Sequence, residues 1–235
     1  MTPAALSLKV HDWHRQRDAS ALGGYVMVVN DNKEASQADS QILHPGTRTL
    51  FRFWEKIRAE NAAPDRGDLD LRQISRIVPN LLILERDHLY QSYRWRLAGS
   101  ETCLLFRQSL TGTDALKGWT SFERDTLKHA FDTVVTSLQP CLIRFRLTTD
   151  KDQVIGAELL GVPVLARNRT RFHIFGGVFS FREIAHLGHD SITHRELSGS
   201  RFIWTEPLPG DKLLAGLRPP DIVSGGFRLI RGGRP

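Results

Sequence analysis

The stretch that decides the fold runs from residue 93 to residue 112 and reads YRWRLAGSETCLLFRQSLTG. Tyr93, Trp95 and Leu97 alternate with two arginines, so the apolar side chains fall on one face of an extended chain and the charges on the other. This alternation predicts a half-buried strand. Ser100 then caps a short apolar helix, and the glycines on either side of that helix let the chain leave the strand and fold across the sheet.

Upstream of this stretch, TRTLFRFWEKIRAEN, which begins at residue 47, predicts an amphipathic helix. Its apolar stripe follows the i, i+3, i+4, i+7 spacing and consists of Leu50, Phe53, Trp54 and Ile57. A stripe with this many aromatic side chains must be buried. The protein's own core is the simpler interpretation, and a contact with a second copy or a partner is the alternative. These four residues are our candidates for a homodimer contact.

Two strands, at 80–87 and 93–99, precede a long amphipathic helix at 122–138. Three further strands follow it without an intervening helix, at 141–149, 153–166 and 171–181. Hairpin-joined strands set apart from a helical insert are typical of an α+β domain. We therefore expect a five-stranded antiparallel sheet with helices over one face.

The composition is that of an ordinary globular protein, with 40% hydrophobic and 25% charged residues among 235. No apolar run approaches the roughly 18 to 20 residues needed to span a bilayer, and the N-terminus does not resemble a secretory signal. Cys103 and Cys141 both lie in apolar surroundings, which favours reduced thiols. We expect a cytoplasmic protein. The net charge of +6 is spread thinly, so we do not expect a nucleic-acid partner.

The order of strands and helices, together with PDRGDLDLRQISRIVPNLLILERD and the RLAG…LTG pair, resembles a bacterial family of standalone PAS-like proteins whose biochemical role is unassigned. The resemblance covers about residues 48–182. It divides the chain into an irregular extension (1–46), a PAS-like domain with its N-terminal helix (47–182) and a Gly- and Pro-rich basic tail (183–235).

The resemblance implies a noncatalytic sensory or regulatory module whose sheet and helices enclose a ligand pocket or a filled core. Its second and third strands would lie at opposite edges of the sheet, and each carries a pair of arginines that would discourage unwanted pairing. A ligand would lie between the sheet and the short helix, near Trp95, Cys103, Phe106, Phe131, Phe145 and Phe175. Because these side chains are bulky, a filled core is as reasonable an expectation as an occupied pocket.

The resemblance leaves the cofactor and the ligand unknown, and we do not expect haem or flavin. His129 on the long helix points away from its apolar face, and Cys103 lacks the sequence context of a flavin-reactive cysteine. No pattern for a catalytic nucleophile or a phosphate-binding loop is present, and no metal ligands are assigned.

Two alternatives stay open. One is a small-molecule enzyme with a metal at the cluster His186, His189 and His194, although these spacings fit no familiar zinc pattern. The other is a nucleic-acid-associated regulator that uses the basic tail. We favour a sensor that acts through contact with a partner protein or with itself, since no kinase, cyclase or DNA-binding pattern accompanies the domain.

Overall fold

The structure is a computed structural model that describes residues 40–87, 89, 91–166, 171–184 and 190–203. Its centre is a six-stranded sheet in which every neighbouring pair is antiparallel. The strand order is β2-β1-β5-β4-β3-β6. The strands are β1 (Leu81–Asp87), β2 (Ser92–Ala98), β3 (Cys141–Thr149), β4 (Val154–Leu165), β5 (Phe172–Ser180) and β6 (Ile192–Phe202). The predicted α+β class and the antiparallel PAS-like sheet are confirmed.

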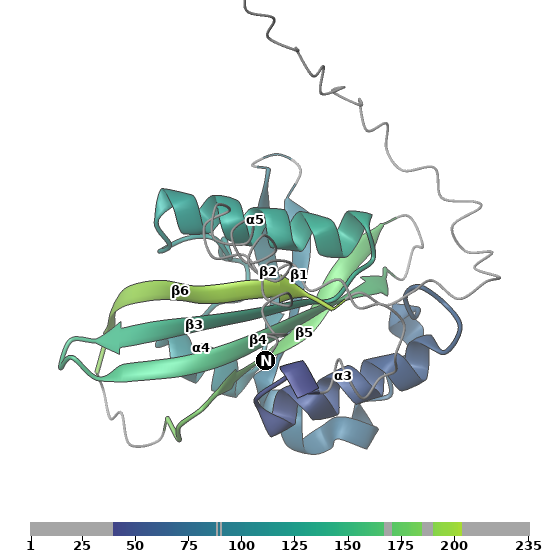
Figure 1. Cartoon of the computed structure of the whole chain (residues 1–235), viewed down its shortest axis with the longest axis horizontal. Coiled ribbons are helices and arrows are strands. Elements are labelled where there is room, and N and C mark those ends of the chain that lie inside the picture. Colours follow the sequence, from purple (N-terminus) through teal and green to yellow (C-terminus); the bar gives the residue numbers. More distant parts are fainter. Residues whose placement is uncertain (1–39, 88, 90, 167–170, 185–189, 204–235) are drawn as a thin grey trace, which may run out of the picture.

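Helices cover both faces of the sheet, whereas the sequence predicted helices over one face. The helical elements are α3 (Pro45–Arg58), η1 (Arg66–Asp68), η2 (Leu71–Asn80), α4 (Ser100–Phe106) and α5 (Ser121–Thr136). Figure 1 shows α5 on one side of the sheet and α3 on the opposite side. We call the face under α4 and α5 the inner face, and the face under α3 the outer face. Two separate hydrophobic layers result, one on each face.

The residues of β4 explain why both faces are covered. Almost every position of this strand is buried, in place of the alternation of a half-exposed strand. Leu159 packs in the inner layer, while Leu160 and Val162 pack in the outer layer. A strand that is apolar on both sides needs a helix on each side. The aromatic stripe of α3 supplies the second cover.

The sixth strand comes from the segment that the sequence assigned to the C-terminal tail. β6 pairs with β3 along its whole length, from Cys141 opposite Phe202 to Thr149 opposite Ile192. Its sequence, ITHRELSGSRF, carries too few apolar residues to show a strand period, and this is why the strand was missed. As a consequence β3 is an interior strand, and the prediction that β3 forms a sheet edge is wrong.

The edge strand β2 is protected by the chain itself. The turn that ends at Gly112, where φ is +85°, brings the following residues alongside β2. The Trp95 amide donates to the Thr113 carbonyl at 3.0 Å, and the Gly112 and Ala115 amides each donate to a β2 carbonyl at 2.7 Å. On the outer face, Arg94 and Arg96 form ion pairs with acidic residues of β1. Backbone pairing therefore covers this edge, and the two arginines balance neighbouring carboxylates.

The close approach of β4 and β5 depends on Gly176. A Cβ atom at this position would lie 2.2 Å from the Leu160 carbonyl oxygen, which belongs to the backbone and cannot retract. Gly199 on β6 is a matched control because a Cβ there would meet nothing within 4 Å. We expect Gly176→Ala to lower the free energy of unfolding by about 1 to 3 kcal/mol or more, the usual cost of overpacking. Gly199→Ala should change it by less than about 0.5 kcal/mol. Urea denaturation measures both, and equal stability of the two variants would contradict the assigned strand contact.

Candidate functional site

A chain of aromatic rings fills the space between the inner face of the sheet and the helices. The centroids of Trp95 and Phe106 lie 6.0 Å apart, and Phe106 continues to Phe145 at 5.7 Å. Trp119 meets Phe145 edge to face at 5.6 Å. Edge-to-face and offset arrangements at these distances are the favourable ones for aromatic pairs. The inner layer is thus a packed aromatic core, and one of the two interpretations of the sequence, a filled interior, describes this part of it.

Five of the six predicted ligand residues lie in this inner layer. Trp95, Phe106, Phe131 and Phe145 are buried members, and Cys103 packs against them with partial exposure. Phe175 does not join them, because it lies in the outer layer beneath α3. Successive residues of β5 point to opposite faces, so Ile174 faces the inner layer and its neighbour Phe175 must face the other way. Phe175 is therefore removed from the candidate site, and a ligand-binding role for the other five stays a prediction.

Arg195 is the polar residue of this site that the sequence analysis missed. It lies on β6 opposite Leu147, and its guanidinium stands over the Phe106 ring at 5.1 Å from the centroid. Its Nη1 donates to the Lys117 carbonyl oxygen at 2.7 Å. Gly118, with φ at +86°, leaves room for it, since a Cβ there would come within 2.9 Å of the guanidinium carbon. Recognition of β6 would have revealed this residue, because alternation along the strand turns it toward the inner face.

The charge of Arg195 is only partly compensated by its surroundings. Burial lowers the pKa of its guanidinium below the ordinary value, which reflects the cost of placing a charge against an aromatic core. The carboxylate of Glu123 reaches the same strand two residues further on, but its oxygens accept from the Leu197 amide at 2.7 Å and from Thr120. Within the described part of the chain, no carboxylate lies within ion-pair distance of Arg195.

Glu123 ties the start of α5 to β6. It forms a capping box with Thr120, the N-cap of α5, while its other oxygen accepts from the Leu197 amide. Burial alone would raise the pKa of the Glu123 carboxyl. The hydrogen bonds from Leu197 and Thr120 outweigh that effect and hold the pKa below its ordinary value. Helix and edge strand are therefore joined by an ionised side chain.

On the outer face, a buried ion pair holds the segment that enters α3. Glu158 on β4 has no exposed side-chain surface, and Arg144 on β3 donates to it at 2.9 Å. Glu158 also accepts from the backbone amides of Leu43 and His44, at 3.2 and 3.0 Å. Arg144 donates to the Gln41 carbonyl at 2.6 Å. A buried charge needs partners of this kind, and here three of the contacts come from the residues just before α3.

The candidate dimer residues of α3 lie against the chain's own sheet. Leu50, Phe53 and Trp54 are buried in the outer layer, and Ile57 packs against it with partial exposure. The indole of Trp54 donates to the Pro163 carbonyl at 2.9 Å. These positions correspond to the core alternative that the sequence left open. They give no support to a dimer contact through the stripe, since its side chains are already covered.

Beyond α3, none of the described helices covers the outer face. Figure 1 shows β3, β4 and β6 continuing past α3 toward the β3–β4 hairpin. We call Arg146, Val154, Phe181 and Arg201 the outer-face patch, in which Arg201, opposite Leu142, lies at the end next to α3. Arg146 is 57% exposed, and its nearest carboxylate, that of Glu196, is 3.8 Å away. Val154 is 47% exposed and Phe181 44%. The position of a Cβ on Gly156 would be 3.3 Å from the Phe181 ring, so this ring lies over β4 beside Arg146.

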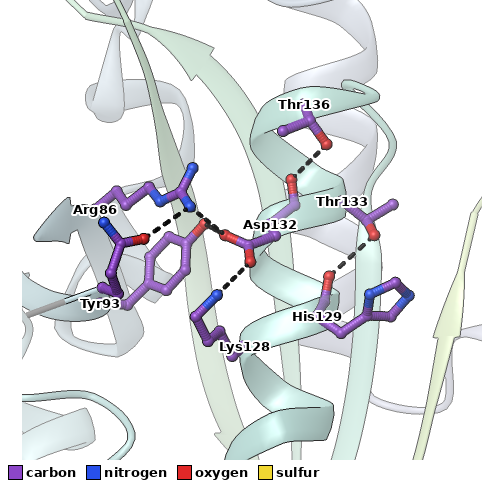
Figure 2. A network of polar contacts seen from close by, with 8 residues as sticks. Arg86, Tyr93, Lys128, His129, Asp132, Thr133 and Thr136 are labelled. Carbon is purple, nitrogen blue, oxygen red and sulfur yellow. Dashed lines mark hydrogen bonds and ion pairs between the residues drawn. The ribbon is translucent and has the colours of Figure 1, made fainter. Parts of the chain in front are cut away.

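A polar network joins α5 to the β1–β2 edge of the sheet (Figure 2). The Tyr93 hydroxyl donates to Asp132 at 2.8 Å, and Lys128 donates to the other oxygen of the same carboxylate at 2.8 Å. Arg86 approaches Asp132 at 3.7 Å. Burial, followed by the Asp132 charge, raises the pKa of the Tyr93 hydroxyl far above its ordinary value, so the hydroxyl remains a donor. The network is a structural connection between helix and sheet.

Of the four histidines considered in the sequence, two lie on described elements and two do not. His129 is exposed on α5, as the sequence predicted, and Figure 2 shows it pointing away from Asp132. His194 belongs to β6 opposite Thr148. His186 and His189 lie outside the described residues, so the predicted cluster with His194 is untested. Among the residues with described positions, no group of three His, Cys, Asp or Glu side chains could hold a metal ion.

His44 makes the entry into α3 sensitive to pH. Its Nδ1 accepts from the Gly46 amide at 3.0 Å, and its ring stacks on Phe179 at 5.1 Å. Burial, opposed by Glu158 and assisted by Arg48, lowers the pKa of His44 in the folded protein. The unfolded chain therefore binds the proton more readily, and stability should fall as the pH drops below about 6.5.

We expect His44→Asn, which keeps a capping acceptor but cannot titrate, to weaken this pH dependence. His129→Asn, at an exposed position of α5, should retain the wild-type slope. Urea unfolding at a series of pH values between neutral and mildly acidic measures the slope for each protein. Some dependence should persist in His44→Asn, because burial also lowers the pKa of His173. A slope identical to wild type would contradict the role of His44.

Comparison with known proteins identifies the family. The family model for the PAS domain matches residues 42–179, which is more than half of the chain. No curated protein matches the sequence. No helix in the described part of the chain is long and apolar enough to cross a membrane. The matched segment begins just before α3 and ends within β5, so it includes most of both hydrophobic layers but not β6. The chain belongs to the PAS domain family.

Proposed function

We propose that this PAS domain protein is a noncatalytic sensory module of the cytoplasm whose output is contact with an acidic segment of another protein through the outer-face patch. Membership of the family supports a sensory or regulatory role in general. The two cysteines are both free, which is consistent with a reducing compartment. The observation that carries the proposal is the open part of the outer face, where arginines and apolar side chains lie together.

The composition of the patch supports a protein partner. Aromatic residues and arginine are enriched at protein interfaces, and Phe181 and Val154 present apolar surface between charged neighbours. Isolated apolar residues on a surface need no explanation, but here they share one sheet face with two arginines. An antiparallel sheet face that no helix covers is ordinarily polar. This one combines the features of an interface core with a charged rim.

The charge of the outer-face patch determines which charge a partner should carry. Glu158 is held by Arg144 and by the backbone amides of Leu43 and His44, so most of its charge is matched within the outer layer. Arg201 has no carboxylate within ion-pair distance among the described residues, and burial together with the nearby Arg144 charge lowers its pKa against the opposing effect of the Glu158 charge. A patch with this excess of positive charge attracts acidic segments and repels a second copy of itself. A different, acidic protein is therefore the partner that fits.

A charge reversal on each side of the outer face tests the proposal. Arg146 and Arg96 are both exposed and both pair with a glutamate across a strand, but Arg96 lies at the far edge on β2. The partner would be identified by cross-linking the full chain in its host and then produced in pure form. We expect Arg146→Glu to weaken the purified complex at least about tenfold and Arg96→Glu to weaken it much less. Titration calorimetry at two salt concentrations gives the affinities, which should fall as salt rises.

Three results would overturn the proposal. One is an equal loss of affinity in the two variants, since this would show a general effect of charge and no site. Another is an identified partner whose contact maps to α5 or the inner face. The third is recovery of second copies of this chain alone, which would make the open face a self-association surface.

A further inference from the structure

The guanidinium of Arg195 forms the polar rim of the aromatic inner layer, between β6, the loop at residues 117–119 and α4. We propose that Arg195 anchors a small oxyanion ligand, a carboxylate or a phosphate, at this rim. The inference rests on the proposed sensory function and deepens it, because it names the chemical class of the molecule that would be sensed. It depends on four features of the structure: the geometry of the guanidinium, its missing counter-charge, a second unsatisfied arginine and the path to the outer face.

Three contacts fix the position of the guanidinium. The Phe106 ring lies beneath the guanidinium carbon, and Gly118 approaches that carbon closely enough that no Cβ would fit. Nη1 is committed to the Lys117 carbonyl oxygen. A guanidinium is planar, so its remaining N–H groups point outward within its own plane. That is the geometry in which arginine binds carboxylate or phosphate through two parallel hydrogen bonds.

The charge balance around Arg195 is incomplete. Half-burying a cation is costly unless an anion or several acceptors compensate it. The Lys117 carbonyl and the Phe106 ring compensate in part, and the nearby Glu123 carboxylate is occupied by Leu197 and Thr120. Burial opposes the charged form of Arg195, and no carboxylate among residues 40–203 with described positions offsets it. A bound anion would supply the counter-charge that the described residues do not.

A second arginine, the residue that follows Phe106 in the sequence, also has unsatisfied donors among the described residues. Arg107 directly follows Phe106 and ends α4 in the left-handed conformation, with φ at 57°. Its Nε and Nη2 are buried, and neither has a hydrogen-bond partner in the part of the chain that the structure describes. Buried guanidinium nitrogens without acceptors are rare in folded proteins. The end of α4, which carries Phe106, thus adds a second cationic group in need of acceptors.

The strand that carries Arg195 also reaches the outer-face patch. Glu196 is the next residue of β6, and alternation turns it to the outer face, where it pairs with Arg146. Leu197 then connects to Glu123 at the start of α5. A ligand that fixes the position of Arg195 therefore acts on a strand segment that also orients an arginine of the proposed partner surface. Ligand binding at the inner face and partner contact at the outer face can therefore be coupled through the adjacent residues Arg195 and Glu196.

Binding of defined probes tests the inference directly. Sodium benzoate is the carboxylate probe, inorganic phosphate is the phosphate probe, and benzamide is the uncharged counterpart of benzoate. Each is titrated into the purified full chain at millimolar concentration and constant ionic strength. We expect the Arg195 Nε–Hε signal in a ¹⁵N–¹H spectrum to shift with benzoate or phosphate and to stay in place with benzamide. The anion that binds more tightly distinguishes a carboxylate ligand from a phosphate ligand.

Variants separate Arg195 from a general effect of positive charge. Arg195→Gln should weaken the bound anion about tenfold or more, the usual loss when a hydrogen bond to a charged group is removed. Arg96→Gln removes the same charge from an exposed position on the opposite face and should leave affinity unchanged. Gly118→Ala keeps every charge but displaces the guanidinium, so it should also weaken binding. Circular dichroism and urea unfolding confirm that each variant is folded.

Two outcomes would overturn the inference. If neither anion shifts the Arg195 signal of the wild-type protein, the rim is not an oxyanion site, and this result needs no variant. If Arg195→Gln and Arg96→Gln bind equally well, the anion binds elsewhere. Both outcomes leave the proposed partner surface standing, because the Arg146 test is made without any added ligand. Failure of that test would in turn leave the anion measurement valid.

Discussion

The buried carboxylate of Glu158 determines where the outer layer of this domain ends. On one side of it, Leu142 and Leu160 face α3 and belong to the hydrophobic layer. On the other side, Arg146 lies opposite Gly156 and is exposed. A charge without any exposed surface must be matched by partners, and removal of one partner of such a pair is strongly destabilising. The Arg144 guanidinium and the amides of Leu43 and His44 meet this requirement, so the segment before α3 is fixed by electrostatics as much as by packing.

Much of the architecture was predictable because it depends on local patterns. Three local patterns predict their elements directly: the alternation around Tyr93 and Trp95, the apolar stripe of α3, and the polar hairpin connections after β3. The sequence does not show which face of the sheet each residue of a buried strand points to. Phe175 looks like any other aromatic of a buried strand, and only the register of β5 with its neighbours shows which layer receives it. A strand buried on both sides gives no alternation from which to read a face.

The residues that were missed share one cause. β6 has few apolar side chains because it is an edge strand with one side open to solvent, and its sequence therefore resembles a polar connector. Arg195 and Arg201 both lie on this strand, and without it neither could be placed on a face of the sheet. The two surfaces with the greatest functional interest thus depend on the element with the weakest sequence signal. Polar edge strands are the elements that hydrophobic periodicity predicts least well.

The bond between the Leu197 amide and Glu123 has a consequence for assembly. A sheet can grow only where an edge offers a continuous row of free donors and acceptors. At the β2 edge, the residues around Thr113 pair with the strand backbone. At the β6 edge, the Leu197 amide already donates to the Glu123 side chain of α5, so it is not free to pair with another strand. An incoming strand would have to displace an ionised carboxylate from its hydrogen bonds. The domain is therefore built to meet other molecules with its faces, and to resist fibrous stacking through its margins.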